Sequence, residues 1–134
     1  QPFVRQMSEV GIRVSLFIEP EPIQLDAAVA VGAPVVELHT GTYAELESSA
    51  QVAEFVRIKT AAAYAESIGL ECHAGHGLTY DNVAPVASIN NIVELNIGHF
   101  LIGEAIFSGL DRAIRHMRSL MDRARADAEG ARST

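Results

Sequence analysis

Strand-like and helix-like segments alternate four times along this chain, and that alternation constrains the fold more than any other feature. The predicted strands cover residues 13–19, 34–40, 71–75 and 93–97, each of which ends at or next to a glycine or a proline. A segment with the apolar spacing of a helix follows each strand. Such alternation predicts parallel strands joined by right-handed crossovers, and therefore an α/β fold.

Glycine and proline also mark the ends of the predicted helices. Residues 3–10 are the end of a helix that stops at Gly11, and Pro22 opens a helix over residues 23–30 that stops at Gly32. The other predicted helices cover residues 44–67, 80–89 and 110 to about 124, with an extra helical turn over residues 100–107.

Polar side chains gather where three of the strands end. Glu37 and His39 lie near the end of the second strand, His76 stands between two glycines after the third, and His99 follows a glycine after the fourth. Flanking glycines remove Cβ atoms that would crowd the histidine at position 76. Because parallel strands deliver their carboxyl ends to one edge of a sheet, these residues predict a single active-site rim.

Two folds place a site at this edge, an open doubly wound sheet and a (β/α)8 TIM barrel. The extra helical turn, entered through Gly98, favours the barrel, because barrels commonly bind phosphate there with backbone N–H groups. A complete barrel needs eight βα units and about 250 residues, whereas this chain has 134. We therefore expect residues 1–126 to supply four units of one barrel domain and residues 127–134 to be a frayed tail.

Composition argues against several other classes of protein. The net charge of -7 is unfavourable for binding nucleic acid, and no apolar run approaches the roughly 18 residues of a membrane span. The single cysteine cannot form an internal disulfide, which fits a cytoplasmic protein. The chain begins at Gln1 in helix-like sequence without an initiator methionine, as we expect if an earlier part of a longer chain precedes it.

Three segments of the chain resemble the carboxyl-terminal half of pyridoxine 5'-phosphate synthase. They are VELHTG at residues 36–41, AGHGLTY at residues 74–80 and ELNIGH at residues 94–99. The run VSLFI at residues 14–18 also fits, and the final helix falls in register. The resemblance covers nearly the whole chain apart from the tail.

This resemblance implies a barrel enzyme, a transferase of vitamin B6 biosynthesis. The family condenses 1-deoxy-D-xylulose 5-phosphate with 3-amino-2-oxopropyl phosphate and closes the pyridine ring, releasing inorganic phosphate and water. The resemblance implies no metal or redox cofactor, and it implies a homo-oligomer if the full barrel forms. It assigns a proton-donor role to His76, transition-state stabilisation to Glu37, and binding of the aminoketone phosphate to Gly77, Gly98 and His99.

The family also uses a histidine and a glutamate as proton acceptors, and arginines that grip the pentulose phosphate. These belong to the first half of the barrel, which this sequence does not contain. Activity of the chain by itself is therefore left open by the resemblance.

The residues themselves leave structural alternatives open. His76 suits proton donation at neutral pH, but a loop histidine can instead bond a carbonyl. Glu37 lies in an apolar strand, where its charge requires either a positive intermediate or a buried Arg or Lys. His39 shares a strand face with Glu37 and either enters the site or orients a loop. His99 can offer its backbone N–H to a phosphate even if its ring does nothing.

A metal site and two other functions are less favoured. Cys72 and His73 are neighbours on a strand and point to opposite faces, which argues against a shared zinc ion. A non-catalytic, phosphate-binding half-barrel remains an alternative, and its unpaired strand edges would make it associate. A barrel aldolase or isomerase would need a Schiff-base lysine on a strand, whereas Lys59, the one lysine, lies in a predicted helix.

Overall fold

Four strands and the helices that connect them make up residues 2–131, the part of the chain that this computed structural model describes. Within these residues no helix combines the length and apolar character needed to cross a membrane. The elements in chain order are α1 (Pro2–Glu9), β1 (Ser15–Ile18), α2 (Pro22–Val31), β2 (Val35–His39), α3 (Gly41–Glu45), α4 (Ser48–Ser67), β3 (Glu71–Gly75), α5 (Val83–Ala87), β4 (Ile92–Asn96), α6 (His99–Ser108) and α7 (Leu110–Gly130).

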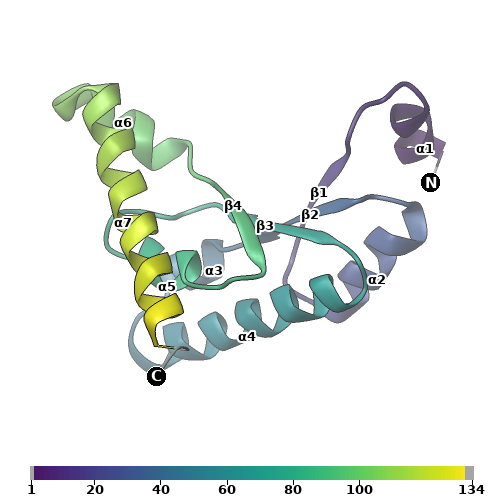
Figure 1. The fold of residues 1–134 in the computed structure, drawn as a ribbon, viewed down its shortest axis with the longest axis horizontal. Helices are drawn as coiled ribbons and strands as arrows, with labels where there is room; N and C mark the ends of the chain where they lie inside the picture. Colours follow the sequence, from purple (N-terminus) through teal and green to yellow (C-terminus); the bar gives the residue numbers. More distant parts are fainter. Residues whose placement is uncertain (1, 132–134) are drawn as a thin grey trace.

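The strands form one parallel sheet in the order β1-β2-β3-β4, which confirms the predicted α/β class. Helices α2, α4 and α5 pack against the same face of the sheet (Figure 1). The strand order follows the chain order without a reversal. The carboxyl ends of all four strands consequently lie at one edge.

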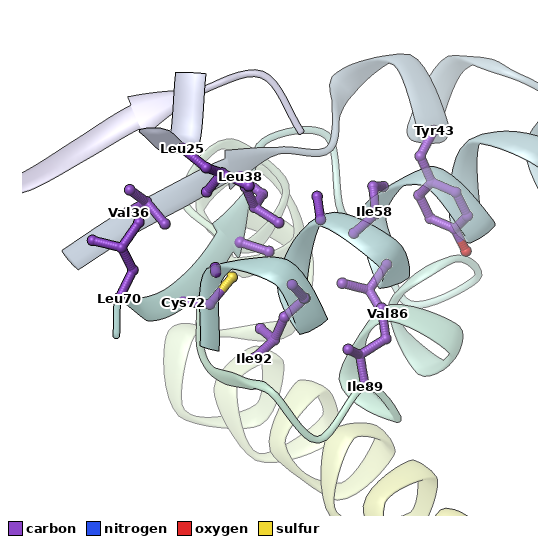
Figure 2. Packing of buried hydrophobic residues seen from close by; sticks show 14 of the residues in the cluster. Leu25, Val36, Leu38, Tyr43, Ile58, Leu70, Cys72, Val86, Ile89 and Ile92 are labelled. Carbon is purple, nitrogen blue, oxygen red and sulfur yellow. The ribbon is translucent and has the colours of Figure 1, made fainter. Parts of the chain in front are cut away.

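The hydrophobic core lies between that face and the helices. Val36 and Leu38 of β2 and Cys72 of β3 point into it, where they meet Ile58 of α4 and Val86 of α5 (Figure 2). All five are at most 1% exposed. Burial raises the pKa of the Cys72 thiol to about 12, so at neutral pH this residue is a protonated, small core side chain.

The opposite face of the sheet is more polar. Phe17, Glu37, His73 and Glu94, one from each strand, are aligned in register across it. Phe17 is 54% exposed, so solvent reaches this face in the described chain. The alternation of side chains along each strand therefore separates a dry core face from a wet face that carries ionisable groups.

The helix predicted over residues 44–67 begins at Ser48 as α4, and a separate short helix, α3, covers Gly41–Glu45 before it. The chain is extended at Leu46 and Glu47 between them. The hydroxyl of the buried Tyr43 donates a 2.8 Å hydrogen bond to the carbonyl of Asn82, and the side-chain amide of Gln51 donates one of 3.2 Å to the carbonyl of Tyr43. The first contact ties α3 to the segment before α5, and the second satisfies a carbonyl in the last turn of α3.

The last helices are longer than predicted, whereas α5 is shorter than the expected 80–89. The extra helical turn is a ten-residue helix, α6. Helix α7 extends through residues 127–130, where the sequence predicts a frayed tail. Alanine is frequent between Arg123 and Ala131, and its high helix propensity explains the extension. Residues 132–134 of that tail lie outside the described residues.

Candidate active site

The carboxyl ends of the strands border an open cleft with a volume of about 720 Å³. All five site residues predicted from the sequence line it: Glu37, His76, Gly77, Gly98 and His99. The sheet therefore brings together groups that are up to 62 positions apart in the chain, from position 37 to position 99. The other lining residues are Phe17, Leu78, Thr79, Asn96, Ile97 and Phe100.

Glu37 on β2 reaches this cleft from the polar face of the sheet. Its Oε2 accepts a 3.0 Å hydrogen bond from Nδ2 of Asn96 on β4. Burial raises the pKa of the Glu37 carboxyl above its ordinary value, and this effect exceeds the opposite effects of nearby His73 and of the Asn96 amide. Among the described residues, the side chain that hydrogen-bonds the Glu37 carboxylate is thus the neutral amide of Asn96. The negative charge of Glu37 therefore remains available to a positively charged ligand.

Gly75 on β3 leaves the space that the Glu37 carboxyl occupies. A Cβ added at Gly75 would overlap Oε1 of Glu37 and the backbone oxygen of Asn96. The sequence analysis did not select Asn96, although it lies in ELNIGH at a strand end. The role of Asn96 depends on its hydrogen bond to Glu37, which lies on another strand. Its position in the sequence therefore gives only a weak indication of that role.

His76 has a backbone conformation that is rare outside glycine. Its φ is +82°, and Gly77 follows at +77°. A Cβ at Gly77 would overlap the Cβ of Ala44, so a glycine is required there for space as well as for conformation. Strain of this kind costs about 1–3 kcal/mol and is concentrated at functional sites. The turn places the exposed His76 at the rim of the cleft.

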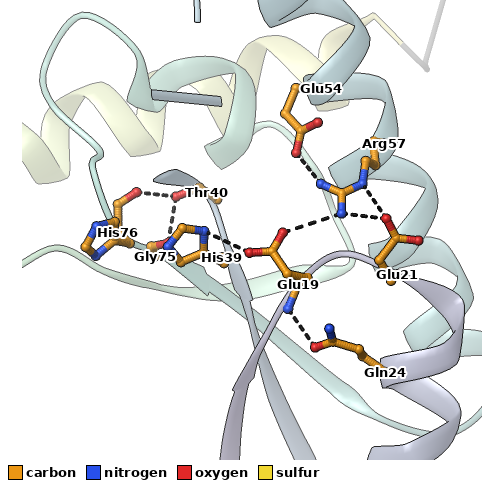
Figure 3. Close-up of polar contacts among 9 residues, drawn as sticks. All are labelled: Glu19, Glu21, Gln24, His39, Thr40, Glu54, Arg57, Gly75 and His76. Carbon is orange, nitrogen blue, oxygen red and sulfur yellow. Dashed lines mark hydrogen bonds and ion pairs between the residues drawn. The ribbon is translucent and has the colours of Figure 1, made fainter. Parts of the chain in front are cut away.

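Thr40 holds the backbone of this strained turn, a role that its place in VELHTG at a strand end does not reveal. Its side chain is fully buried, and Oγ1 lies 2.7 Å from the carbonyl oxygen of Gly75 and 2.6 Å from that of His76 (Figure 3). The Thr40 amide also donates to the Gly75 carbonyl, at 2.8 Å. The end of β2 thus braces the end of β3.

Replacing Thr40 by Val is expected to lower the free energy of unfolding by about 1–3 kcal/mol, because the His76 carbonyl loses its hydroxyl partner and the Gly75 carbonyl keeps only the backbone amide, while the side-chain volume changes little. Chemical denaturation measures this effect. The control is Thr42→Val, at an exposed position of α3 two residues away, which should change stability by less than about 0.5 kcal/mol. Equal effects of the two variants would contradict a bracing role for Thr40.

The other two strand histidines lie outside the cleft lining. The ring of His39 stacks behind that of His76, with centroids 4.9 Å apart and an interplanar angle of 23°. His73 lies deeper on the polar face, with Nε2 2.8 Å from Oε1 of Glu71. Bonds from Arg13 and His73 lower the pKa of the Glu71 carboxyl to about 2. His73 thus belongs to a charged cluster beneath the cleft.

Gly98 and His99 form the start of α6 at the far side of the cleft. The amide of Ile102 makes the first helical hydrogen bond, 3.0 Å to the carbonyl of Gly98. The amides before it have no acceptor within the helix, and the helix dipole adds a partial positive charge there. An anion such as a phosphate group is favoured at this end of the cleft.

Comparisons with known proteins identify a family that this chain resembles in sequence. The family model described as pyridoxal phosphate biosynthesis protein PdxJ matches residues 1–123. The chain is 62% identical over 124 residues to pyridoxine 5'-phosphate synthase of Rhodospirillum rubrum and 58% identical over 127 residues to that of Zymomonas mobilis. These matches cover 92% and 95% of this chain but 50% of each relative. The chain therefore spans about half the length of the curated relatives it matches.

Proposed function

The chain belongs to the family of pyridoxal phosphate biosynthesis protein PdxJ, and from this premise we propose that it supplies the carboxyl-terminal half of a pyridoxine 5'-phosphate synthase. The reaction is the condensation of 3-amino-2-oxopropyl phosphate with 1-deoxy-D-xylulose 5-phosphate, with closure of the pyridine ring and release of phosphate and water. The observation that carries the proposal is the single cleft lined by Glu37, His76 and the start of α6.

Each of the three groups has a distinct task in this proposal. His76 donates a proton to a hydroxyl group that leaves as water, since an imidazolium releases a proton readily near neutral pH. Glu37 stabilises the positive charge of an iminium intermediate, because its carboxylate is partly desolvated and bonded only to an amide among the described contacts. Gly77, Gly98 and His99 hold the aminoketone phosphate through backbone N–H groups.

The second half of the proposal is that β1 and β4 pair with further strands to close a (β/α)8 barrel. Three features support it. The strand order follows the chain, helices α2, α4 and α5 cover one face, and the polar face carries the site. Closure would remove both exposed edges and bury Phe17, which is 54% exposed here. The assembled enzyme would be a homo-oligomer.

Complementation tests this function. The amino-terminal half of the Rhodospirillum rubrum relative, co-produced with this chain, is expected to form a stable complex that makes pyridoxine 5'-phosphate from the two substrates. Each half alone should make none, because the proton acceptors and the phosphate site would lie on different halves. Product is measured by chromatography. A stable complex that binds inorganic phosphate but forms no product would refute the catalytic proposal.

That last result would favour the alternative, a non-catalytic phosphate-binding half-barrel. The unpaired edges of β1 and β4 are the observation behind it, since such edges and an open sheet face promote association. Sedimentation of the chain alone, with and without inorganic phosphate, tests this alternative. A monodisperse monomer under both conditions would count against it.

A further inference from the structure

His39 has no role in the proposed reaction, yet its ring is contacted by Glu19 on one side and by His76 on the other. Its Nδ1 atom is buried and lies 3.4 Å from Oε1 of Glu19, without the geometry of a hydrogen bond. Its ring stacks on His76 at a centroid distance of 4.9 Å and meets Phe17 edge-on at 5.0 Å. His39 itself is not among the residues that line the cleft.

The carboxylate of Glu19 is in turn anchored by Arg57 of α4. Nη2 of Arg57 lies 3.4 Å from Oε2 of Glu19 (Figure 3). The same guanidinium contacts Glu21 at 2.7 Å and Glu54 at 2.6 Å, so three carboxylates fix its position. The backbone N–H of Glu19 also donates to Oε1 of Gln24 at 3.0 Å. The contact chain therefore runs from a helix on the core side of the sheet to the rim.

The space around the two stacked rings is tight. A Cβ added at Gly41 would overlap the ring of His39 and would lie 3.0 Å from Cδ2 of His76. His76 is exposed on its other side, toward the cleft. On its inner side the His76 ring packs against the His39 ring at 4.9 Å, with Phe17 next to both at 5.0 and 6.3 Å.

We propose that His39 is a positioning residue: Glu19, anchored by Arg57, fixes the His39 ring, and that ring fixes the direction in which His76 faces the cleft. Of the residues given a task in the proposed reaction, His76 is the one whose ring stacks on that of His39. The His39 ring also meets Phe17 of the cleft lining. The inference rests on the proposed function, in which His76 donates a proton, because proton transfer depends on orientation. A displacement of about 1 Å in a catalytic group can cost about 100-fold in rate.

Two substitutions at position 39 separate stacking from imidazole chemistry in the complemented enzyme. His39→Leu removes the flat ring and is expected to lower kcat by about 10- to 100-fold while KM changes less than about 3-fold. His39→Phe keeps a flat ring and should retain kcat within about 3-fold of the wild type. Equal losses in both variants would overturn the positioning role, because they would mean that the imidazole nitrogens are needed. A wild-type kcat in His39→Leu would overturn it as well.

A second pair tests the anchor without altering either histidine. Glu19→Ala and Glu21→Ala each remove one carboxylate from Arg57, but only Glu19 faces His39. We expect kcat to fall by about 5- to 20-fold in Glu19→Ala and to stay within about 2-fold in Glu21→Ala, which leaves two carboxylates on the guanidinium. Identical kcat values in the two variants would contradict the contact chain.

A readout that needs no activity distinguishes this inference from the proposed function. The chain has five histidines, so selective ring labelling gives few NMR signals, which single variants assign. In the labelled chain bound to its unlabelled partner half, His39→Leu and Glu19→Ala should shift the ring signals of His76, whereas Glu21→Ala should not. Unshifted His76 signals would overturn the positioning role. Shifted signals in a complex that forms no product would support it while refuting the proposed reaction.

Discussion

Replacing His76 by Asn is expected to reduce kcat of the complemented enzyme by about 100- to 10,000-fold, the usual contribution of a general acid. Asn is the informative choice because it tolerates positive φ better than most residues, and the backbone at position 76 has a φ of +82°. The turn should therefore keep its shape while the proton donor is lost. Steady-state kinetics of pyridoxine 5'-phosphate formation measure the effect.

The matched control for this variant is His116→Asn on α7, far along the chain and outside the cleft lining. Its kcat should equal that of the wild type. The melting temperatures of both variants should stay close to that of the unmodified complex, since neither ring is part of the core. A His76→Asn enzyme with at least one-third of the wild-type kcat would remove His76 from the role of proton donor.

Replacing Glu37 by Gln is expected to lower kcat by about 100- to 1,000-fold, because the neutral amide cannot stabilise a developing positive charge. The side-chain shape is retained, and Oε1 of Gln can still accept the hydrogen bond that Asn96 donates at 3.0 Å in the wild type. The loss should therefore appear in kcat, with little change in KM for either phosphate substrate. An unchanged kcat would show that the carboxylate charge has no part in the rate-limiting step.

The same substitution should increase stability, and the effect should depend on pH. The pKa of Glu37 is raised by burial from its ordinary value of 4.5, so the folded protein binds this proton more tightly than the unfolded chain does. Wild-type stability consequently falls as pH rises through and above 4.5, until the folded carboxyl has also ionised. Glu37→Gln lacks this loss and should unfold at a higher denaturant concentration at pH 7, but at a similar one at pH 4. A variant less stable at pH 7 would contradict the burial effect.

Much of the framework could be predicted because its signals are local. Strands near residues 34–40 and 71–75 end at glycines, and helices follow them, so a parallel sheet was the expected arrangement. The glycines around His76 likewise marked a turn at a strand end. The break between α3 and α4 was not predicted. The hydrogen bond that holds α3 next to this break joins the Tyr43 hydroxyl to the carbonyl of Asn82, 39 positions away, and so leaves no local signal.

Supporting residues of the site were also missed for a physical reason. Thr40 contacts the two carbonyls of Gly75 and His76 at the end of β3, at 2.7 and 2.6 Å, and Asn96 bonds a carboxylate of β2 at 3.0 Å. Neither residue type at a strand end is unusual, so nothing in the local pattern sets them apart. His39 was recognised as sharing a face with Glu37, but its stack on His76 arises from the pairing of β2 with β3.

The order of apolar, polar and glycine residues was by itself sufficient to determine the α/β class. It also determined the sheet edge at which Glu37, His76 and His99 occur. Both could be inferred because side-chain alternation and chain reversal are properties of short segments. Only the tertiary structure decided which of these groups meet, what braces them and which histidine reaches the cleft. Contacts between strands depend on register, and a shift of one residue would turn every side chain to the other face.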